Sequence, residues 1–259
     1  MTAAKKAAEA PKDVPDAGSR LPAGDADNQA SSTPPHAGHT AVYLVRPGKR
    51  NEELRYSLRS LANTPVERVV VVGYCPPSIQ PDAYVPTDQK LGDKKTNLRR
   101  GYEALVASDA VPEQFSLWWD DIYAMRPVTL APLHRGPLRP LLARMRRHSG
   151  PTGYWKGLSA VADLLPDDAL AYEPLHAPQP VTKTSVAKAL ALHDSHNGMR
   201  TLLGNLDQIG GTEHPNVKNA DPEQWGQLDY LSTSDKSFKY RDIGRHIRKR
   251  FPDPSRWET

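Results

Sequence analysis

Apolar positions from residue 40 onward alternate between strand-like runs and a helix-like stripe. Ala41–Val45 and Val69–Val72 are uninterrupted apolar runs, and the second consists entirely of valines. Runs without polar alternation are typical of parallel strands that are covered on both faces. Between them, Leu54, Leu58 and Leu61 recur at the spacing of one helix face. The three segments together predict a strand–helix–strand unit.

The same pattern continues through the rest of the chain. Phe115–Trp119 is expected to be a third strand, and it runs directly into two aspartates. Asn51 is the expected N-cap of the first helix, and a proline-rich loop is expected from Tyr74 to Gly92. Further helices are expected at Lys94–Ser108, Pro137–His148, Tyr154–Leu164, Thr184–His193, Met199–Gln208 and Asp242–Arg250. We therefore expect an α/β fold with an open, mostly parallel sheet that is flanked by helices.

Residues 1–39 have a different composition, which is rich in Ala, Pro, Asp and Ser and contains no aromatic residue. Such a segment cannot bury enough apolar surface to offset the entropy lost on ordering, so we expect a disordered tail. Residues 40–259 are then expected to be a single folded domain. Lys5 and Lys6 are not followed by the apolar core of a signal peptide. A cytoplasmic location is therefore expected, in the host cell if a phage encodes the protein.

Composition narrows the functional classes. The 259 residues include a single cysteine, Cys75, which excludes an internal disulfide framework and a zinc site built on cysteine pairs. No apolar run approaches the roughly 18 residues that a membrane span needs. The formal net charge of +4 is modest and does not by itself imply a nucleic-acid partner. The 25 prolines, about twice the average share, indicate many rigid loops.

The first candidate for chemistry is the acid pair, Asp120 and Asp121, at the end of the third expected strand. Adjacent carboxylates repel each other unless a cation is present, and Mg²⁺ or Mn²⁺ commonly binds one or two carboxylates together with substrate phosphates. Ligands of open α/β sheets bind at the carboxyl ends of the strands. The two earlier strands end at Arg46-Pro47-Gly48 and at Gly73. The alternative is that Asp120 caps the next turn and that Asp121 is solvated.

Two further groups could bind phosphate or metal. Lys95 and Arg99 are spaced i, i+4 near the start of an expected helix, beside Asn97, so both cations could face one phosphate group. His176 is flanked by nearby prolines, and a histidine positioned in this way could be a third metal ligand. The alternatives are a solvated helix face and a structural histidine.

Two segments, His134–His148 and Lys236–Arg250, are rich in basic residues. They could hold a diphosphate, an acidic acceptor or nucleic acid. The first segment lacks the interleaved aromatic residues that single-strand binding uses. Solvated basic helices are the commonest outcome for such runs, so nucleic acid is not the expected partner.

One string resembles a known family. Residues Glu53–Ser60 read ELRYSLRS, which resembles a segment of the Stealth-type family, whose members transfer sugar phosphates from nucleotide sugars. Trp119–Asp121 is similar to that family's Asn-Asp-Asp step, with Trp in place of Asn, and Tyr172–Pro180 is similar to a later segment. Met199–Gly211 and Phe251–Glu258 are similar to segments of glycosyltransferases from actinobacterial phages.

The resemblance implies a GT-A-type fold, a Rossmann-like domain that binds a nucleotide-diphosphate sugar beside an acidic metal motif. It implies that Asp121 binds the metal and that Asp120 binds the ribose or the metal. The residues that it places near the nucleotide are Arg46, Pro47, Gly48 and Arg55.

We expect a metal-dependent glycosyltransferase that uses Mn²⁺ or Mg²⁺ and moves a sugar from a nucleotide-diphosphate sugar to a hydroxyl of a protein or glycan acceptor. A metal on Asp121, together with Lys95, Arg99 and His176, would stabilise the leaving diphosphate, and Asp235 is the candidate catalytic base. Two alternatives stay open: sugar-phosphate transfer of the Stealth type, and a non-enzymatic basic protein that binds nucleic acid or a virion. The expected nucleotide- and phosphate-binding residues are Arg46, Pro47, Gly48, Arg55, Gly73, Lys95, Asn97, Arg99 and Asp120.

Overall fold

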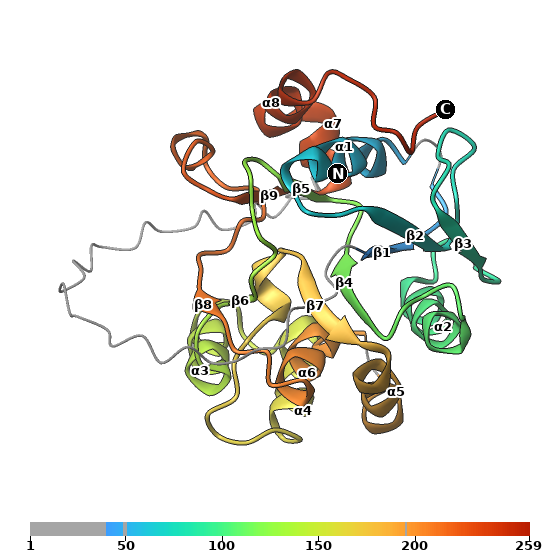
Figure 1. The fold of residues 1–259 in the computed structure, drawn as a ribbon. Helices are drawn as coiled ribbons and strands as arrows, with labels where there is room; N and C mark the ends of the chain where they lie inside the picture. The colour runs from blue at the N-terminus through green and yellow to red at the C-terminus, as the bar shows by residue number, and fades with distance from the viewer. Residues whose placement is uncertain (1–39, 49–50, 195) are drawn as a thin grey trace, which may run out of the picture. The chain divides into compact units, whose positions relative to one another are not determined.

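Five strands build the central sheet of this computed structural model, which describes residues 40–48, 51–194 and 196–259. In the spatial order β3-β2-β1-β4-β7, their bounds are Ala83–Pro86, Arg68–Gly73, Thr40–Val45, Gln114–Trp118 and Gln179–Thr182 (Figure 1). The first four strands of this order pair in parallel, and β7 runs antiparallel to β4 at one edge. The expected mostly parallel sheet is therefore confirmed. The segment 1–39, expected to be a disordered tail, lies outside the described residues.

The sheet separates two apolar cores because successive residues of a strand point to opposite faces. Val42 and Leu44 of β1 pack on one face, against α2 (Lys94–Ala107), α5 (Lys183–Leu192) and α6 (Met199–Leu206). Tyr43 and Val45 pack on the other, against α1 (Glu52–Ser60), α7 (Asp235–Tyr240) and α8 (Asp242–Arg250). Figure 1 shows α1, α7 and α8 above the sheet and α2, α5 and α6 below it. The described residues form a mixed α/β domain, as expected.

Shorter elements complete this part of the chain. β5 (Ile122–Ala124) pairs antiparallel with β9 (Tyr230–Ser232), and β6 (Leu133–His134) pairs in parallel with β8 (Thr212–Glu213). α3 (Leu138–Ser149) packs against α4 (Gly153–Ala162) in a third apolar cluster. The 3₁₀ helices are η1 (Leu61–Asn63), η2 (Glu173–Leu175) and η3 (Pro222–Gln224). Within the described ranges, no helix is both long and apolar enough to cross a bilayer.

Two local expectations are wrong. Asn51 has a left-handed backbone with φ 45° and makes no capping hydrogen bond to α1. Its Nδ2 donates instead to the Arg46 carbonyl oxygen at 3.2 Å, so the side chain closes the turn after β1. The expected loop from Tyr74 to Gly92 contains β3, a short and partly exposed edge strand that ends at Pro86. Its few residues and its terminal proline make such a strand resemble a loop in the sequence.

Polar contacts fasten the C-terminal segment to α1 and to the residues before β3. We call these contacts the C-terminal clasp, which consists of Arg55, Arg59, Asp82, Trp257 and Glu258. The carboxylate of Glu258 accepts hydrogen bonds from Arg55 Nε at 2.8 Å and from Arg59 Nε and Nη2 at 2.8 and 2.9 Å. Arg59 Nη1 donates to two carbonyl oxygens just after α8, and Trp257 Nε1 donates to Asp82 Oδ2 at 2.7 Å. The clasp therefore pairs its buried charges within the chain.

Candidate active-site cleft

A cleft with a volume of about 590 Å³ opens where the carboxyl ends of β1, β2 and β4 meet. Val45, Arg46, Val72 and the segment 119–121 line it from the strand ends. Its other walls come from the start of α2, from η2 and α6, and from the start of α7. Small-molecule sites commonly measure about 300–1,000 Å³, so the cleft suits a nucleotide-sized ligand.

The acid pair, Asp120 and Asp121, lies in this cleft directly after β4. Lys218 Nζ donates to Asp121 Oδ2 at 3.1 Å, and the Asp121 side chain is 19% exposed. The Asp120 carboxylate forms no ion pair and accepts no hydrogen bond from another described side chain. Burial and the charge of Asp121 raise the pKa of Asp120, and Arg46 opposes that rise. The raised pKa means that the charged form of the Asp120 carboxyl is disfavoured unless a proton or a cation neutralises it.

Two more carboxylates lie near the acid pair. Asp235 begins α7, is exposed, and pairs with Arg46 Nη2 at 3.2 Å. Glu53 in α1 accepts a hydrogen bond from Thr233 Oγ1 at 2.5 Å. Burial raises the pKa of Glu53, and the charges of the acid pair and Asp235 raise it further, although the Thr233 hydrogen bond lowers it. One side of the site is therefore strongly acidic.

Basic side chains adjoin this acidic side. His176 follows η2 with a left-handed φ of 57°, Arg200 lies in α6, and Lys218 pairs with Asp121. Burial, together with the charges of Lys218 and Arg200, lowers the pKa of His176 to about 3, so its imidazole is neutral near pH 7. A neutral imidazole is the form that binds metal ions.

The structure brings six of the expected site residues to the cleft: Arg46, Asn97, Asp120, Asp121, His176 and Asp235. Both polar atoms of the Asn97 amide bond to the Lys90 backbone. The Lys90 N–H donates to Asn97 Oδ1 at 2.8 Å, and Asn97 Nδ2 donates to the Lys90 carbonyl oxygen at 2.7 Å. Asn97 therefore fixes the turn before α2. Gly73 lies at the end of β2 with φ +107°, and a Cβ there would come within 2.3 Å of the Val45 carbonyl oxygen. Glycine at this position allows the two strand ends to approach closely.

Arg55, Pro47 and Gly48, expected near the nucleotide, do not line the cleft. Arg55 belongs to the C-terminal clasp, because its Nε donates to Glu258 at 2.8 Å. Pro47 and Gly48 continue the loop that leaves β1 after Arg46. The resemblance that suggested Arg55 covers α1, whose opposite face carries Glu53 toward the acid pair.

The two cations expected to share one phosphate are also placed outside the cleft lining. Arg99 pairs with Glu103 at 2.9 Å and with Asp194 at 3.1 Å. Lys95 is exposed, whereas the preceding residue, Lys94, lines the cleft. Successive helix residues point about 100° apart, so a shift of one position changes which cation of α2 reaches a ligand.

Sequence reasoning did not place Glu173, Arg200 and Lys218 in the cleft, nor Glu53 beside the acid pair. Arg200 and Lys218 lie in segments without a charge run or a spacing that would mark them. Glu53 lies in the string that carries the family resemblance, but the helical pattern gives it only an exposed position. These residues meet through contacts between distant segments, which local patterns do not reveal.

The acid pair fits a divalent cation. In the parts of the chain that the structure describes, no three His, Cys, Asp or Glu side chains converge as a complete metal cage. Mg²⁺ and Mn²⁺ sites that use substrate phosphates need only one or two carboxylates, because phosphate oxygens and waters supply the other ligands. The carboxylate of Asp120, which no other described side chain pairs, and that of the adjacent Asp121 provide suitable donors. His176 lines the same cleft but does not form such a three-residue group with them.

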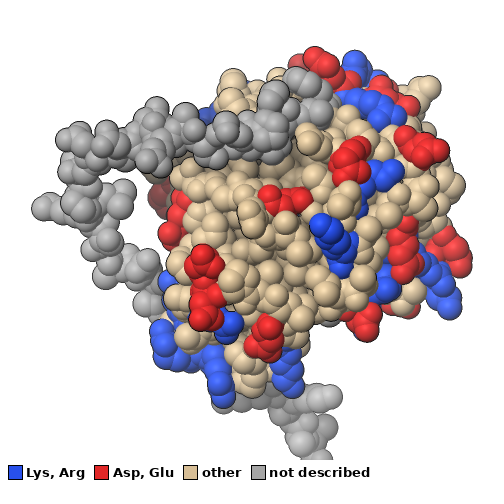
Figure 2. Space-filling model, turned by 60° about the horizontal axis from the view of Figure 1, so that its bottom comes forward, with Lys and Arg blue, Asp and Glu red and all other residues tan. Residues whose placement is uncertain are grey.

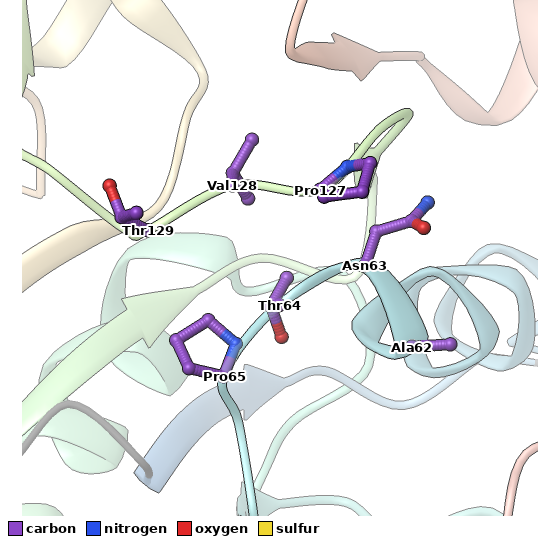
Figure 3. Close-up of a pocket in the computed structure, with 7 residues that line it drawn as sticks. All are labelled: Ala62, Asn63, Thr64, Pro65, Pro127, Val128 and Thr129. Carbon is purple, nitrogen blue, oxygen red and sulfur yellow. The ribbon is translucent and has the colours of Figure 1, made fainter.

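Two other hollows among the described residues lack this combination. A hollow of about 470 Å³ lies beside η1, and the side chains that line it in Figure 3 include none that ionises near neutral pH. Another, of about 560 Å³, adjoins the C-terminal clasp. On the face drawn in Figure 2, the described basic side chains form small groups among acidic ones rather than one continuous surface. The exposed arginines of α3 include Arg139, which pairs with Asp167 at 2.8 Å.

No known protein family matches the chain, and comparison with curated proteins finds no match. The functional argument therefore depends on the chemistry of the cleft.

Proposed function

We propose that the chain is a metal-dependent glycosyltransferase that binds a nucleotide-diphosphate sugar in the cleft. The observation that carries the proposal is the acid pair, which lies at the ligand-binding edge of a mostly parallel sheet with one carboxylate unpartnered. The sheet, with its antiparallel edge strand β7, is compatible with the GT-A-type fold that the sequence resemblance implies.

The charges of the cleft suit the departure of a diphosphate. Breaking the bond between the sugar and the diphosphate leaves negative charge on the leaving group. The acid pair would hold Mn²⁺ or Mg²⁺, which supplies Lewis-acid stabilisation of that charge when bound. Lys94 and Lys236 also line the cleft, and preorganised cations of this kind stabilise charge as it develops.

The acceptor hydroxyl must lose a proton, and Asp235 is our candidate for the base. Asp235 lines the cleft at the start of α7, where its carboxylate pairs with Arg46 Nη2 at 3.2 Å. Glu53 is the other carboxylate near the acid pair, but it accepts a hydrogen bond from the Thr233 hydroxyl and does not line the cleft. Asp235 is therefore the better placed of the two to meet an acceptor.

Product analysis tests the proposal. The full chain is incubated with Mn²⁺ and a panel of nucleotide sugars, and the released nucleotide is identified. Glycosyl transfer releases a nucleoside diphosphate, whereas sugar-phosphate transfer releases a monophosphate. Asp121→Asn should abolish the release. Asp167→Asn is the control and should not change it, because Asp167 is an exposed carboxylate that pairs with Arg139 away from the cleft lining. Absence of diphosphate release from every sugar by the folded protein would contradict the proposal.

A further inference from the structure

A buried arginine in the cleft has a donor group without a partner. Arg200 in α6 is 3% exposed and lines the cleft. Its Nε donates to Gln179 Oε1 at 3.2 Å, and its Nη2 donates to the Ala177 carbonyl oxygen. Its Nη1 has no hydrogen-bond partner among the described residues. Because a buried donor without a partner is unfavourable, and more so when it is charged, a ligand is the expected partner.

The positive charge of Arg200 is also not balanced by an ion pair within the described residues. Glu173 lies nearby, but its Oε2 accepts the backbone N–H of Arg200 at 2.8 Å. Burial raises the pKa of the Glu173 carboxyl, whereas the charge of Arg200 and the backbone N–H groups of Arg200, Gly198 and Thr201 lower it. The helix N-terminus thus engages the Glu173 carboxylate. Glu173 therefore offsets part of the guanidinium charge without forming an ion pair with it, and the Nη1 donor stays unpartnered.

The surroundings hold this guanidinium in place. The side-chain oxygen and nitrogen of Gln179 bond to Arg200 Nε and to its backbone oxygen, the latter at 2.8 Å. One turn further along α6, a Cβ at Gly204 would come within 2.5 Å of the Tyr172 ring, so α6 packs closely against η2. A guanidinium held in this way, with a free Nη1 donor, suits an oxyanion.

We propose that Arg200 is the main binding residue of an oxyanion subsite. In this subsite a phosphate or carboxylate group of the substrate binds the guanidinium directly and without the metal ion. Only the source of the oxyanion rests on the proposed function. It is either the diphosphate of the donor or an acidic group on the sugar or the acceptor. Lys218 and His176 line the same cleft and can add donors to the bound group.

Calorimetric titration with inorganic phosphate, in EDTA and with the full chain, tests the subsite. Wild-type protein should bind phosphate, and Arg200→Lys, which keeps a charge but loses the planar fork, should raise the Kd at least about tenfold. Arg68→Lys is the matched control, because Arg68 is a half-buried arginine at the amino end of β2 whose Nη1 donates to the Ala110 carbonyl oxygen at 2.8 Å. An unchanged Kd in folded Arg200→Lys, or no phosphate binding by the wild type in the millimolar range, would overturn the proposal.

A second measurement covers the case in which Arg200→Lys does not fold. In the NMR spectrum of the wild type, phosphate should shift the side-chain N–H signals of Arg200. The signals of Arg59, whose Nε, Nη1 and Nη2 all donate within the chain, should stay in place. Phosphate binding that leaves the Arg200 signals unmoved would overturn the proposal.

Competition assigns the source of the oxyanion. If a nucleoside diphosphate with Mn²⁺ displaces phosphate, the donor diphosphate occupies the subsite. If both bind together, the occupant is an acidic group of the sugar or the acceptor. Phosphate binding at Arg200 without any metal-dependent nucleotide binding would support the subsite and contradict the glycosyltransferase, so the two failures are distinguishable.

Discussion

Arg59 in the C-terminal clasp and Arg200 in the cleft are both withdrawn from water, with 9% and 3% exposure, but the chain satisfies them differently. Arg59 donates through Nε, Nη1 and Nη2 to the Glu258 carboxylate and to two carbonyl oxygens. Arg200 has an unpartnered Nη1 and no ion pair within the described part of the chain. Burial of a charge is costly unless it is paired, so the two positions have different energetic roles.

The comparison distinguishes the charges of the clasp, which stabilise the fold, from the charges of the cleft, which are available to a ligand. In the clasp, opposite charges meet within the chain. In the cleft, the adjacent carboxylates of Asp120 and Asp121 repel each other, and Arg200 forms no ion pair within the described residues. A bound cation and a bound oxyanion would each relieve one of these conflicts. Substitutions in the clasp should therefore change stability, and substitutions in the cleft should change binding and turnover.

The largest effect is expected from Asp121→Asn. Electrostatic stabilisation of a developing charge is commonly worth about 100-fold in rate, so nucleoside diphosphate release should fall by about that factor or more. The free energy of unfolding should change by only about 1 kcal/mol, because the Asp121 pair with Lys218 is partly exposed. Initial rates and denaturant titrations measure the two quantities. If Asp121→Asn retained its turnover, or lost it only because the protein unfolded, the cleft would not differ from the clasp in the way described.

Glu258→Gln should have the opposite profile. The Glu258 side chain is 2% exposed and pairs with Arg55 and Arg59, so the substitution leaves a buried cation unmatched. We expect a loss of about 3 kcal/mol in the free energy of unfolding, measured by denaturant titration. Nucleotide and phosphate binding by the folded variant should remain within about twofold of the wild type. A stable variant with impaired binding would show that the clasp contributes to the site.

The clasp should also weaken in acid. Burial alone would raise the pKa of Glu258, but hydrogen bonds from Arg59, the Ser255 backbone and Arg55 lower it from 4.5 to about 2. A lowered pKa in the folded state contributes stability above the unfolded value, and that contribution is lost as pH falls. The stability difference between the wild type and Glu258→Gln should therefore shrink by roughly 2 kcal/mol from about pH 5 to pH 2. A constant difference across this range would contradict the pairing.

The smallest effect is expected from Arg99→Gln. This residue was expected to bind phosphate from its spacing to Lys95, but it pairs with Glu103 and Asp194 at the surface. Exposed ion pairs contribute about 0–1 kcal/mol, so stability should change little. Nucleotide affinity, measured by calorimetry, should change less than about twofold. A tenfold loss of nucleotide affinity would show that Arg99 belongs to the binding site.

The sequence predicts the parts of the fold that depend on local periodicity. The valine run of β2 and the leucine stripe of α1 each contain their own pattern, and both elements form where expected. β3 escapes prediction because a short, half-exposed edge strand ending in proline has little periodicity. β5 and β9 are three residues each and depend on pairing across more than a hundred residues of chain.

The same limit applies to the site. The acid pair could be placed from sequence because a buried strand runs directly into it, which fixes it at the sheet edge. Arg200 and Lys218 could not, because their position depends on how α6 and the segment before β9 pack against the strand ends. Arg55 was misplaced in the same way, since its contact with Glu258 joins residues 203 positions apart.

The most direct test of the central claim is calorimetric titration of uridine and guanosine diphosphates into the full chain, with Mn²⁺ and with EDTA. The account predicts that at least one nucleotide binds, that binding requires Mn²⁺, and that Asp121→Asn eliminates it while Asp167→Asn does not. Equal binding in EDTA, equal binding by folded Asp121→Asn, or no binding of either nucleotide would contradict the account.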